Sequence, residues 1–263
     1  MPISERITVT WSSEKKPACQ PDLERYKRQL MLRGFTPGHQ QKLCNSTALV
    51  GGVGGLGGTA AVYLAVAGIG KLIIFHSGNL TLSNMNRQIL MKNDRIGQPR
   101  APQAKETINA INPDVIVETH DARINKENLA PALASSDIAL SARPNFSERR
   151  VLNEGCVRLG KPMVEAAMDG MQGYLFNYIP GKKTPCLECV FPETDPQWEE
   201  LGFSVIGPVP GVLGAMMAME AIKIITGFGR PLESHMLIYD ALNTETKRFH
   251  IRRNGKCPVC GRS

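Results

Sequence analysis

A glycine cluster between residues 51 and 58 constrains the fold of this chain more than any other segment. Residues 48–59 hold an apolar stretch and then a G-x-G-G-x-G motif, formed by Gly52, Gly54, Gly55 and Gly57. Residues 59–66 have helical composition, and residues 72–75 are apolar as in a strand. This order is typical of a nucleotide-binding βαβ unit, in which glycines let the backbone approach a phosphate. A glycine-rich turn that binds nothing is the alternative, and the flanking segments favour the nucleotide site.

The rest of the chain alternates predicted strands and helices before its pattern changes. Strands are expected at 115–119, 136–140 and 162–166, and helices at 101–111, 125–133 and 149–159. Beyond residue 170 we expect antiparallel strands at 173–179, 236–240 and 246–251, with a long apolar helix at 211–226. This order predicts an α/β fold: a Rossmann-like, doubly wound, mostly parallel sheet with an antiparallel C-terminal extension. Residues 21–263 are predicted to form a single nucleotide-binding domain after a flexible N-terminus, 1–20.

Charge and composition indicate which kinds of molecule this protein can bind. The net charge of +7 suits an anionic ligand, but the basic residues are spread out and lack the interleaved aromatic residues of a nucleic-acid groove. We therefore expect a nucleotide ligand and no nucleic acid. No apolar run approaches the roughly 18 residues of a membrane span, and the N-terminus lacks the apolar region of a signal peptide. These features predict a cytoplasmic protein that does not bind membranes.

Four of the seven cysteines form two C-x-x-C pairs, Cys186 with Cys189 and Cys257 with Cys260. In a chain predicted to be cytoplasmic, such pairs indicate metal ligands rather than disulfides. Four thiolates make a closed tetrahedral Zn²⁺ site with no open position for chemistry, so we predict structural zinc. Two chance pairs or a redox-active dithiol are the alternatives. Cys156 lies in a helical, apolar context and is interpreted as a core residue.

Several motifs occur together in a fixed order along the chain. They are Arg25-Tyr26-Lys27-Arg28-Gln29, Gly52 to Gly57, Leu82 to Gln88, Gly97-Gln98-Pro99, Ile111-Asn112-Pro113, both C-x-x-C pairs and Gly211 to Lys223. In this combination, from about Arg25 to Gly261, the chain resembles the MoeB/ThiF/HesA branch of the ubiquitin-activating-enzyme superfamily. The resemblance implies a homodimer that binds ATP with Mg²⁺ and attaches AMP to a carboxylate. In that branch the carboxylate is usually the C-terminal glycine of a small ubiquitin-like sulfur carrier.

The resemblance also implies roles for individual residues. Arg28 matches an arginine that reaches the partner subunit's nucleotide, and residues 52–57, with Leu56 among them, match the phosphate loop. The other implied nucleotide contacts are His76, Asn84, Arg87, Gln88, Arg100 and Asn145. Arginines beside the triphosphate would neutralise it while a carboxylate oxygen attacks the α-phosphorus and pyrophosphate leaves. Arg28 and Arg87 are therefore expected to be catalytic.

The nucleotide site departs from the family pattern at several positions. His76 stands where relatives carry an acid that holds the ribose hydroxyls, and NAD binding would use an acid at the same place. Pro144 replaces an aspartate linked to Mg²⁺, and Arg100 replaces a lysine. Residues 198–208 lack the cysteine that some relatives use in thioester or persulfide chemistry. These changes predict a pocket more positive than that of the relatives.

Three hypotheses follow. The first is ATP-dependent adenylation of a carboxylate on a carrier protein, a peptide or a small acid, with a replacement carboxylate near the metal. Glu165 and Asp169 are the candidates for that carboxylate, and we predict that Asp169 is catalytic. The second is a degenerate relative that keeps the fold, the zinc and the dimer but only binds a nucleotide or a partner. A nicotinamide dehydrogenase is a third hypothesis, supported by the glycine loop alone.

Overall fold

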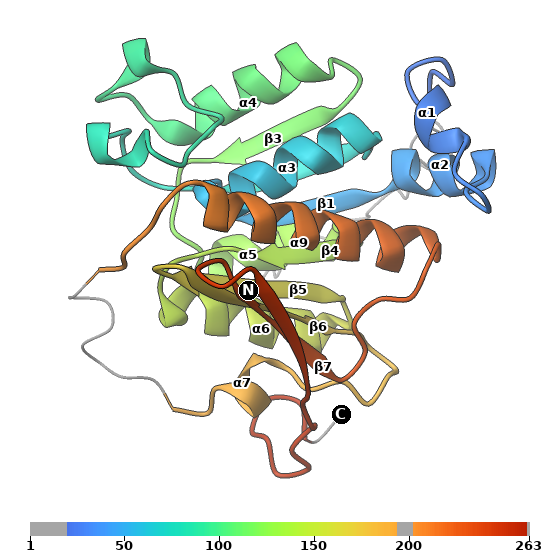
Figure 1. The fold of residues 1–263 in the computed structure, drawn as a ribbon, viewed down its shortest axis with the longest axis vertical. Coiled ribbons are helices and arrows are strands. Elements are labelled where there is room, and N and C mark those ends of the chain that lie inside the picture. Colours follow the sequence, from blue (N-terminus) through green and yellow to red (C-terminus); the bar gives the residue numbers. More distant parts are fainter. Residues whose placement is uncertain (1–19, 194–201, 262–263) are drawn as a thin grey trace, which may run out of the picture.

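The central feature of the fold is an eight-stranded sheet with the strand order β3-β2-β1-β4-β5-β6-β7-β8 (Figure 1). The computed structural model describes residues 20–193 and 202–261, so the prediction for the N-terminus falls almost entirely outside the described residues. The strands are β1 (Thr47–Gly51), β2 (Lys71–Phe75), β3 (Ile116–His120), β4 (Ile138–Ser141), β5 (Met163–Asp169), β6 (Gln172–Tyr178), β7 (His235–Asp240) and β8 (Glu245–His250). β1 to β5 pair in parallel, and β6 to β8 continue the sheet antiparallel. The predicted mixed sheet is confirmed.

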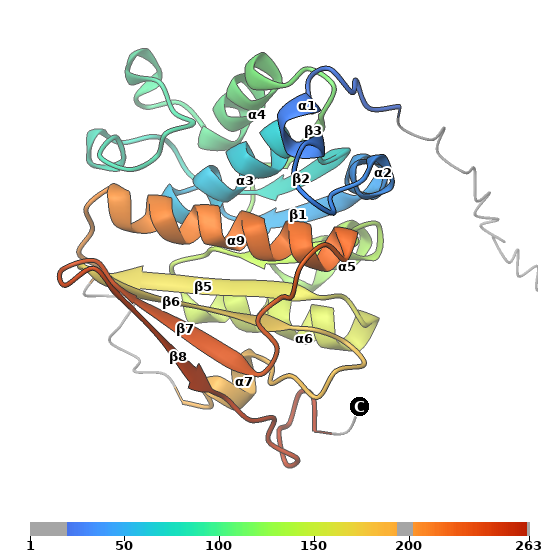
Figure 2. The same ribbon diagram turned by 45° about the vertical axis from the view of Figure 1, so that its right-hand side comes forward.

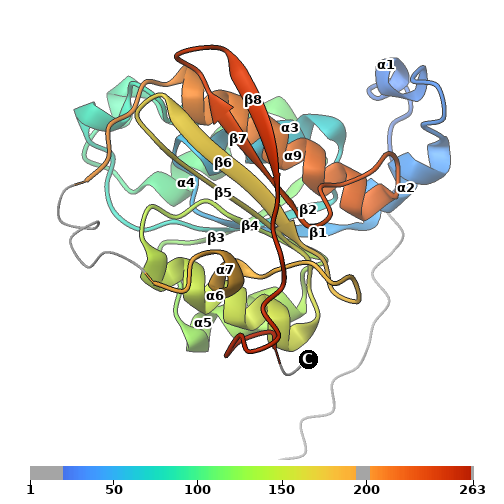
Figure 3. The ribbon, with the colours of Figure 1, turned by 60° about the horizontal axis from the view of Figure 1, so that its bottom comes forward.

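Helices cover both faces of the sheet. They are α1 (Lys27–Leu30), α2 (Pro37–Asn45), α3 (Gly55–Ala67), α4 (Arg100–Ile111), α5 (Lys126–Ala134), α6 (Phe146–Leu159), α7 (Leu187–Val190) and α9 (Pro208–Thr226), with short 3-10 turns η1 (Leu82–Asn84) and η2 (Asn93–Arg95). α3 and α9 lie side by side on one face (Figure 2), whereas α5 and α6 lie together on the other (Figure 3). Each face has its own group of buried apolar side chains.

The glycine motif permits very close backbone contacts at the start of α3. A Cβ on Gly57 would lie 1.8 Å from the carbonyl oxygen of Gly52, and a Cβ on Gly214 of α9 would lie 2.4 Å from that of Leu56. Gly52 also has a φ of +102°, which side chains rarely tolerate. The motif therefore fixes both the turn after β1 and the packing of α9 against α3.

α9 is apolar almost all round because it packs between α3 and strands β5 and β6. By its length and hydropathy, α9 could cross a membrane, which was not expected from the sequence. It is the one such helix in residues 20–193 and 202–261. Half of its most apolar window is buried, as in a core helix. Met219 on α9 and Tyr63 on α3 remain exposed, at 56% and 50%.

The starts of two helices depend on single side chains. α1 begins at Lys27, and Tyr26 directly before it is buried, with its hydroxyl accepting a hydrogen bond from Asn112 Nδ2 at 3.1 Å. α6 begins at Phe146 rather than Arg149 because Asn145 caps it, accepting a hydrogen bond from the backbone N–H of Glu148. The earlier start of α6 brings its first turn to the carboxyl end of β4.

Candidate active site

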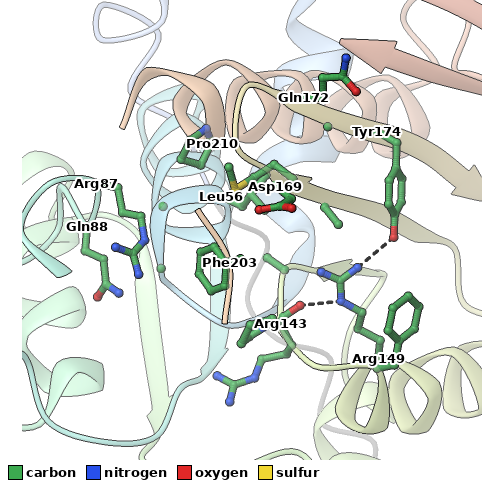
Figure 4. A pocket seen from close by; sticks show the side chains of 18 of the residues that line it. Leu56, Arg87, Gln88, Arg143, Arg149, Asp169, Gln172, Tyr174, Phe203 and Pro210 are labelled. Carbon is green, nitrogen blue, oxygen red and sulfur yellow. Dashed lines mark hydrogen bonds between the residues drawn. The ribbon is translucent and has the colours of Figure 1, made fainter. Parts of the chain in front are cut away.

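A cavity of about 640 Å³ lies at the carboxyl ends of β1, β4 and β5 (Figure 4). The strand order reverses at this point, and open α/β sheets bind their ligands at such a switch point. One end of the cavity is formed by the glycine turn and arginines, and the other by aromatic residues of β6, α6 and the chain after α7. The predicted site residues that line it are Gly54, Gly55, Leu56, His76, Arg87, Gln88, Arg100 and Asp169.

The first turn of α3 faces one end of the cavity. Gly54 caps this helix without a side-chain hydrogen bond, so the first N–H groups of α3 have no side-chain cap. Free N–H groups at a helix N-terminus bind phosphate and carboxylate groups. Gly52 and Gly57 lie behind the turn, where they permit its tight geometry, and they do not line the cavity.

Arg87 lies at the same end of the cavity. Its Nη1 donates hydrogen bonds to Ser83 O at 3.0 Å and Asn86 Oδ1 at 2.8 Å, and its guanidinium carbon lies 5.3 Å from the centre of the Phe203 ring. Gln88 lies beside it, and its buried Oε1 has no hydrogen-bond partner among the described residues. Asn84 instead accepts a hydrogen bond from the Thr81 N–H at η1 and does not line the cavity.

His76 directly follows β2. It is 5% exposed, and burial, with Arg100 and Arg143 nearby, lowers its pKa to about 3. The ring is therefore neutral at pH 7, and its Nδ1 accepts a hydrogen bond from the Val53 N–H at 3.2 Å. Arg100 holds the loop after His76, because its Nη2 donates to Ser77 O at 2.7 Å.

Arg143 lines the cavity although the sequence did not predict it as a site residue. It follows β4 directly before Pro144 and is 6% exposed. Its Nη2 forms an ion pair with Glu148 Oε1 at 2.7 Å, and its Nη1 lies 3.3 Å from His76 Nδ1. Its only sequence signal was its place next to Pro144, a position that the sequence analysis had singled out.

The two candidate carboxylates, Glu165 and Asp169, lie on β5 in different surroundings. Glu165 is fully buried and does not line the cavity; its Oε1 accepts hydrogen bonds from Arg149 Nη1 at 2.7 Å and Tyr174 Oη at 3.2 Å. Asp169 lies at the end of β5, and its Oδ1 accepts hydrogen bonds from the Ser204 N–H and hydroxyl, both at 3.0 Å. Of the described residues that line the cavity, Asp169 is the only carboxylate.

Two predicted nucleotide contacts, Arg28 and Asn145, lie outside the cavity lining. Arg28 is part of α1, where its Nη1 approaches Met31 Sδ at 4.0 Å. Its predicted role needs a second subunit and stays a prediction. Asn145 caps α6, and its side-chain amide also donates to Glu148 Oε1 at 2.8 Å.

The four predicted zinc ligands, Cys186, Cys189, Cys257 and Cys260, come together at one point, with all sulfur atoms within 4.8 Å of one another. The Sγ–Sγ distances are 3.9 Å for Cys186 and Cys189, 3.7 Å for Cys186 and Cys257, and 3.3 Å for Cys189 and Cys260. Four sulfurs at tetrahedral positions around Zn²⁺ lie ~3.8 Å apart, given a Zn–S distance of about 2.3 Å. The donor set therefore fits a closed metal site. Cys156 of α6 lies in the same buried cluster but is not one of the four possible ligands, and burial raises the pKa of its thiol.

The cysteine cluster also supports the aromatic end of the cavity. Phe191 comes directly after α7, which carries Cys189, and its ring lies 5.0 Å from that of Tyr174 and 5.8 Å from that of Phe146. Arg150 of α6 donates to Phe191 O at 3.1 Å. The segment that holds two of the four sulfurs thus positions a wall of the cavity.

Comparisons with known proteins agree with this geometry. The ThiF family model matches residues 26–259. "Protein HesA, heterocyst" from Trichormus variabilis is 52% identical over 91% of this chain and 89% of its own length. The molybdopterin-synthase adenylyltransferase of Escherichia coli is 36% identical, over 91% of this chain and 97% of that protein. Among solved structures, E. coli MccB with ATP has a TM-score of 0.75 at 25% identity, covering 85% of this chain and 68% of that one.

Proposed function

Because this chain belongs to the ThiF family, we propose that it is an ATP-dependent adenylyltransferase acting on the C-terminal carboxylate of a small ubiquitin-like carrier protein, a related peptide or a small acid. The observation that carries the proposal is one cavity in which a free helix N-terminus and Arg87 face the same space as Asp169. The names of relatives support it, since one is a molybdopterin-synthase adenylyltransferase and one solved structure contains ATP.

In the proposed reaction, the arginine end of the cavity holds the triphosphate. Arg87 and the N–H groups of α3 are donors suited to phosphate oxygens. A substrate carboxylate oxygen forms a bond to the α-phosphorus, the bond from that phosphorus to the pyrophosphate oxygen breaks, and an acyl-adenylate results. The guanidinium of Arg87 would stabilise the negative charge of the leaving pyrophosphate.

We assign Asp169 to the metal that accompanies ATP. Mg²⁺ prefers carboxylate oxygens, and Asp169 is exposed at the cavity while Ser204 fixes its orientation. Mg²⁺ bound there would neutralise phosphate charge. Glu165 is unsuited to this role, because Arg149 and Tyr174 already use its Oε1 in the interior.

The aromatic end of the cavity suits the substrate that carries the carboxylate. Phe146, Tyr174 and Phe191 form an apolar wall beyond Asp169. An extended peptide tail entering between this wall and Phe203 would bring its carboxylate toward the phosphates. This geometry accommodates a peptide tail or a small acid, and a panel of both kinds of substrate distinguishes them.

Pyrophosphate exchange tests the proposal. Purified protein is incubated with ATP, labelled pyrophosphate and a panel of glycine-ended carrier proteins and small acids; exchange with at least one of them is expected. Asp169→Asn should lower exchange far more than ATP affinity, whereas Asp94→Asn, an exposed acid outside the cavity, should change neither. Arg87→Ala should abolish ATP binding, and Arg95→Ala, also outside the cavity, is its matched control.

Binding without catalysis is the second candidate function, and one observation favours it. Asp169 is the only acid among the described cavity-lining residues, so these residues offer a metal a single carboxylate. ATP binding without pyrophosphate exchange for any carboxylate offered would support this alternative. If Asp169→Asn has no effect in an active enzyme, the metal role of Asp169 is wrong although adenylation stands.

We also propose a zinc-bound homodimer in the cytoplasm. The four converging cysteines support zinc, and elemental analysis of reduced protein should find one Zn²⁺ per chain. The exposed Tyr63 and Met219 on adjacent helices support a subunit interface. Sedimentation equilibrium at micromolar concentration should give twice the 28.8 kDa chain mass, and a single-chain mass alone would contradict the dimer.

A further inference from the structure

Two buried donors at the arginine end of the cavity lack hydrogen-bond partners. His76 Nδ1 accepts from the Val53 N–H and lies 3.3 Å from Arg143 Nη1, a group that can only donate. The hydrogen of the neutral ring is therefore on Nε2, and Nε2 has no partner among the described residues. Arg143 Nε is likewise buried and unpartnered. Leaving a buried donor without an acceptor costs free energy, so both atoms require an acceptor that the described residues do not supply.

The path of the Arg143 side chain explains why these donors meet. Arg143 begins after β4, and His76 lies after β2, on the opposite side of β1. A Cβ on Gly52, at the end of β1, would lie 3.0 Å from Arg143 Cδ. The absence of a side chain at Gly52 therefore lets Arg143 cross the turn between β1 and α3 and reach His76. The two donors lie next to the turn that is suited to a phosphate.

The charged side chains around the cavity are mostly positive. Its lining includes four arginines, Arg87, Arg100, Arg143 and Arg149, and among the described residues one acid, Asp169. Arg149 is neutralised by Glu165 and Arg143 by Glu148. Arg87 and Arg100 donate to uncharged oxygens, and neither forms an ion pair with a described residue. Burial and the neighbouring Arg143 and Arg87 lower the pKa of Arg100, and the nearby Asp121 offsets only part of this effect. A polyanion can thus be held here by guanidinium groups in place of a metal ion.

We propose that His76 Nε2 and Arg143 Nε form a phosphate site that lets this cavity bind ATP without a divalent cation. The inference rests on the proposed function only in taking the ligand to be ATP. An acid at the end of β2 would accept hydrogen bonds from ribose hydroxyls, whereas His76 and Arg143 present only donors there. The ligand group beside them must therefore be an acceptor, and a phosphate oxygen is the strongest acceptor that a nucleotide offers.

Calorimetry of ATP binding in excess Mg²⁺ and in excess EDTA tests the site. For the wild type, the dissociation constants in the two buffers should differ by less than about threefold. Arg143→Ala should weaken binding in EDTA by about tenfold or more, as expected for a lost charge-assisted hydrogen bond, and Mg²⁺ should restore part of the affinity. Arg143→Lys keeps a charge to pair with Glu148 but lacks Nε, so it tests the site if Arg143→Ala fails to fold.

His76 offers a matched pair of variants. The amide oxygen of His76→Asn can replace Nδ1 as the acceptor for the Val53 N–H, but no donor then replaces Nε2. His76→Gln places an amide N–H near the position of Nε2. We expect His76→Asn to weaken ATP binding in EDTA by several fold and His76→Gln to retain most of the affinity. Equal losses in both variants would show that only packing was disturbed and would overturn the role of Nε2.

Three further results would overturn the phosphate site. They are ATP binding by the wild type only in Mg²⁺, no ATP binding in either buffer, and tighter binding by Arg143→Ala, which would mean that the side chain blocks the cavity. Pyrophosphate exchange separates this inference from the proposed function. Metal-independent binding without exchange keeps the phosphate site and refutes the adenylyltransferase, whereas exchange with strictly Mg²⁺-dependent binding does the reverse.

Discussion

The buried ion pair between Arg149 and Glu165 allows a quantitative prediction of how much its loss lowers the stability of the fold. The Nη1 and Oε1 atoms are 2.7 Å apart, and the side chains are 5% and 0% exposed. Glu165→Gln keeps the shape of the side chain but removes its charge. The Arg149 guanidinium then stays in the interior without a counter-charge, although it still donates to Arg143 O and to Tyr174 Oη.

The expected loss of stability follows from this geometry. Removing one partner of a buried ion pair costs about 3–5 kcal/mol. Because Arg149 keeps two uncharged acceptors, we take the lower end, about 3 kcal/mol. In a chain of this size each kcal/mol lowers the melting temperature by roughly 2–4 °C, so Glu165→Gln should melt roughly 6–12 °C below the wild type.

Thermal unfolding followed by circular dichroism measures the difference. The control is Glu154→Gln, which breaks the surface pair with Lys126, 2.9 Å long with side chains 66% and 48% exposed, and should cost less than about 1 kcal/mol. Added salt should leave the effect of Glu165→Gln unchanged, because the pair is shielded from solvent. If both variants melt within about 2 °C of each other, the buried pair does not stabilise the fold as argued.

Three other predictions concern separate parts of the molecule. Cys260→Ser should abolish zinc binding and lower the melting temperature, measured by elemental analysis and calorimetry, and a variant with full zinc content would contradict the four-sulfur site. Gly57→Ala should cost about 3 kcal/mol or more, or yield insoluble protein, because its Cβ would lie 1.8 Å from Gly52 O; a denaturant midpoint like that of the wild type would disprove the close contact. The pKa of His76 is about 6.5 in the unfolded chain and about 3 in the folded protein. As the pH falls from 6.5 toward 3, the free energy of unfolding of the wild type should therefore decrease by about 1.4 kcal/mol per pH unit relative to His76→Asn. Urea unfolding at several pH values checks this, and a pH-independent difference would refute it.

The sequence predicted the order of the elements well because most of the parallel strands are short, largely apolar runs bounded by turns, and β3 is rich in β-branched residues. The glycine motif, the strands at β1 to β5 and the long helix α9 all follow from local composition. Helix ends were less predictable, since they depend on side-chain caps and distant contacts. Asn145 starts α6 a turn earlier than its composition indicates, and the contact of Tyr26 with Asn112 joins residues far apart in the chain.

The site was predictable where motifs act locally and unpredictable where side chains cross between elements. The cysteine pairs and the glycine turn were found from spacing alone. Arg143 was missed because its path over Gly52 to His76 depends on the strand order, which places β4 and β2 on either side of β1. Glu165 and Asp169 were both candidates in the sequence, with Asp169 predicted to be catalytic, and four residues along β5 separate them by ~13 Å, from the interior to the end of the strand.

The cysteine cluster constrains the order in which the two ends of the cavity can form during protein synthesis. A chain leaving the ribosome presents the glycine turn and the arginines early, but Cys257 and Cys260 emerge 71 residues after Cys186 and Cys189, respectively. Until they do, the segment with Cys186 and Cys189 has only two of its four sulfurs, and Phe191 beside it lacks its full anchor. A nascent chain can therefore complete the phosphate end of its cavity first, whereas the aromatic wall gains its full support only after Cys257 and Cys260 have been added. A polypeptide truncated after residue 256 would lack Cys257 and Cys260, so that wall would never gain its full support.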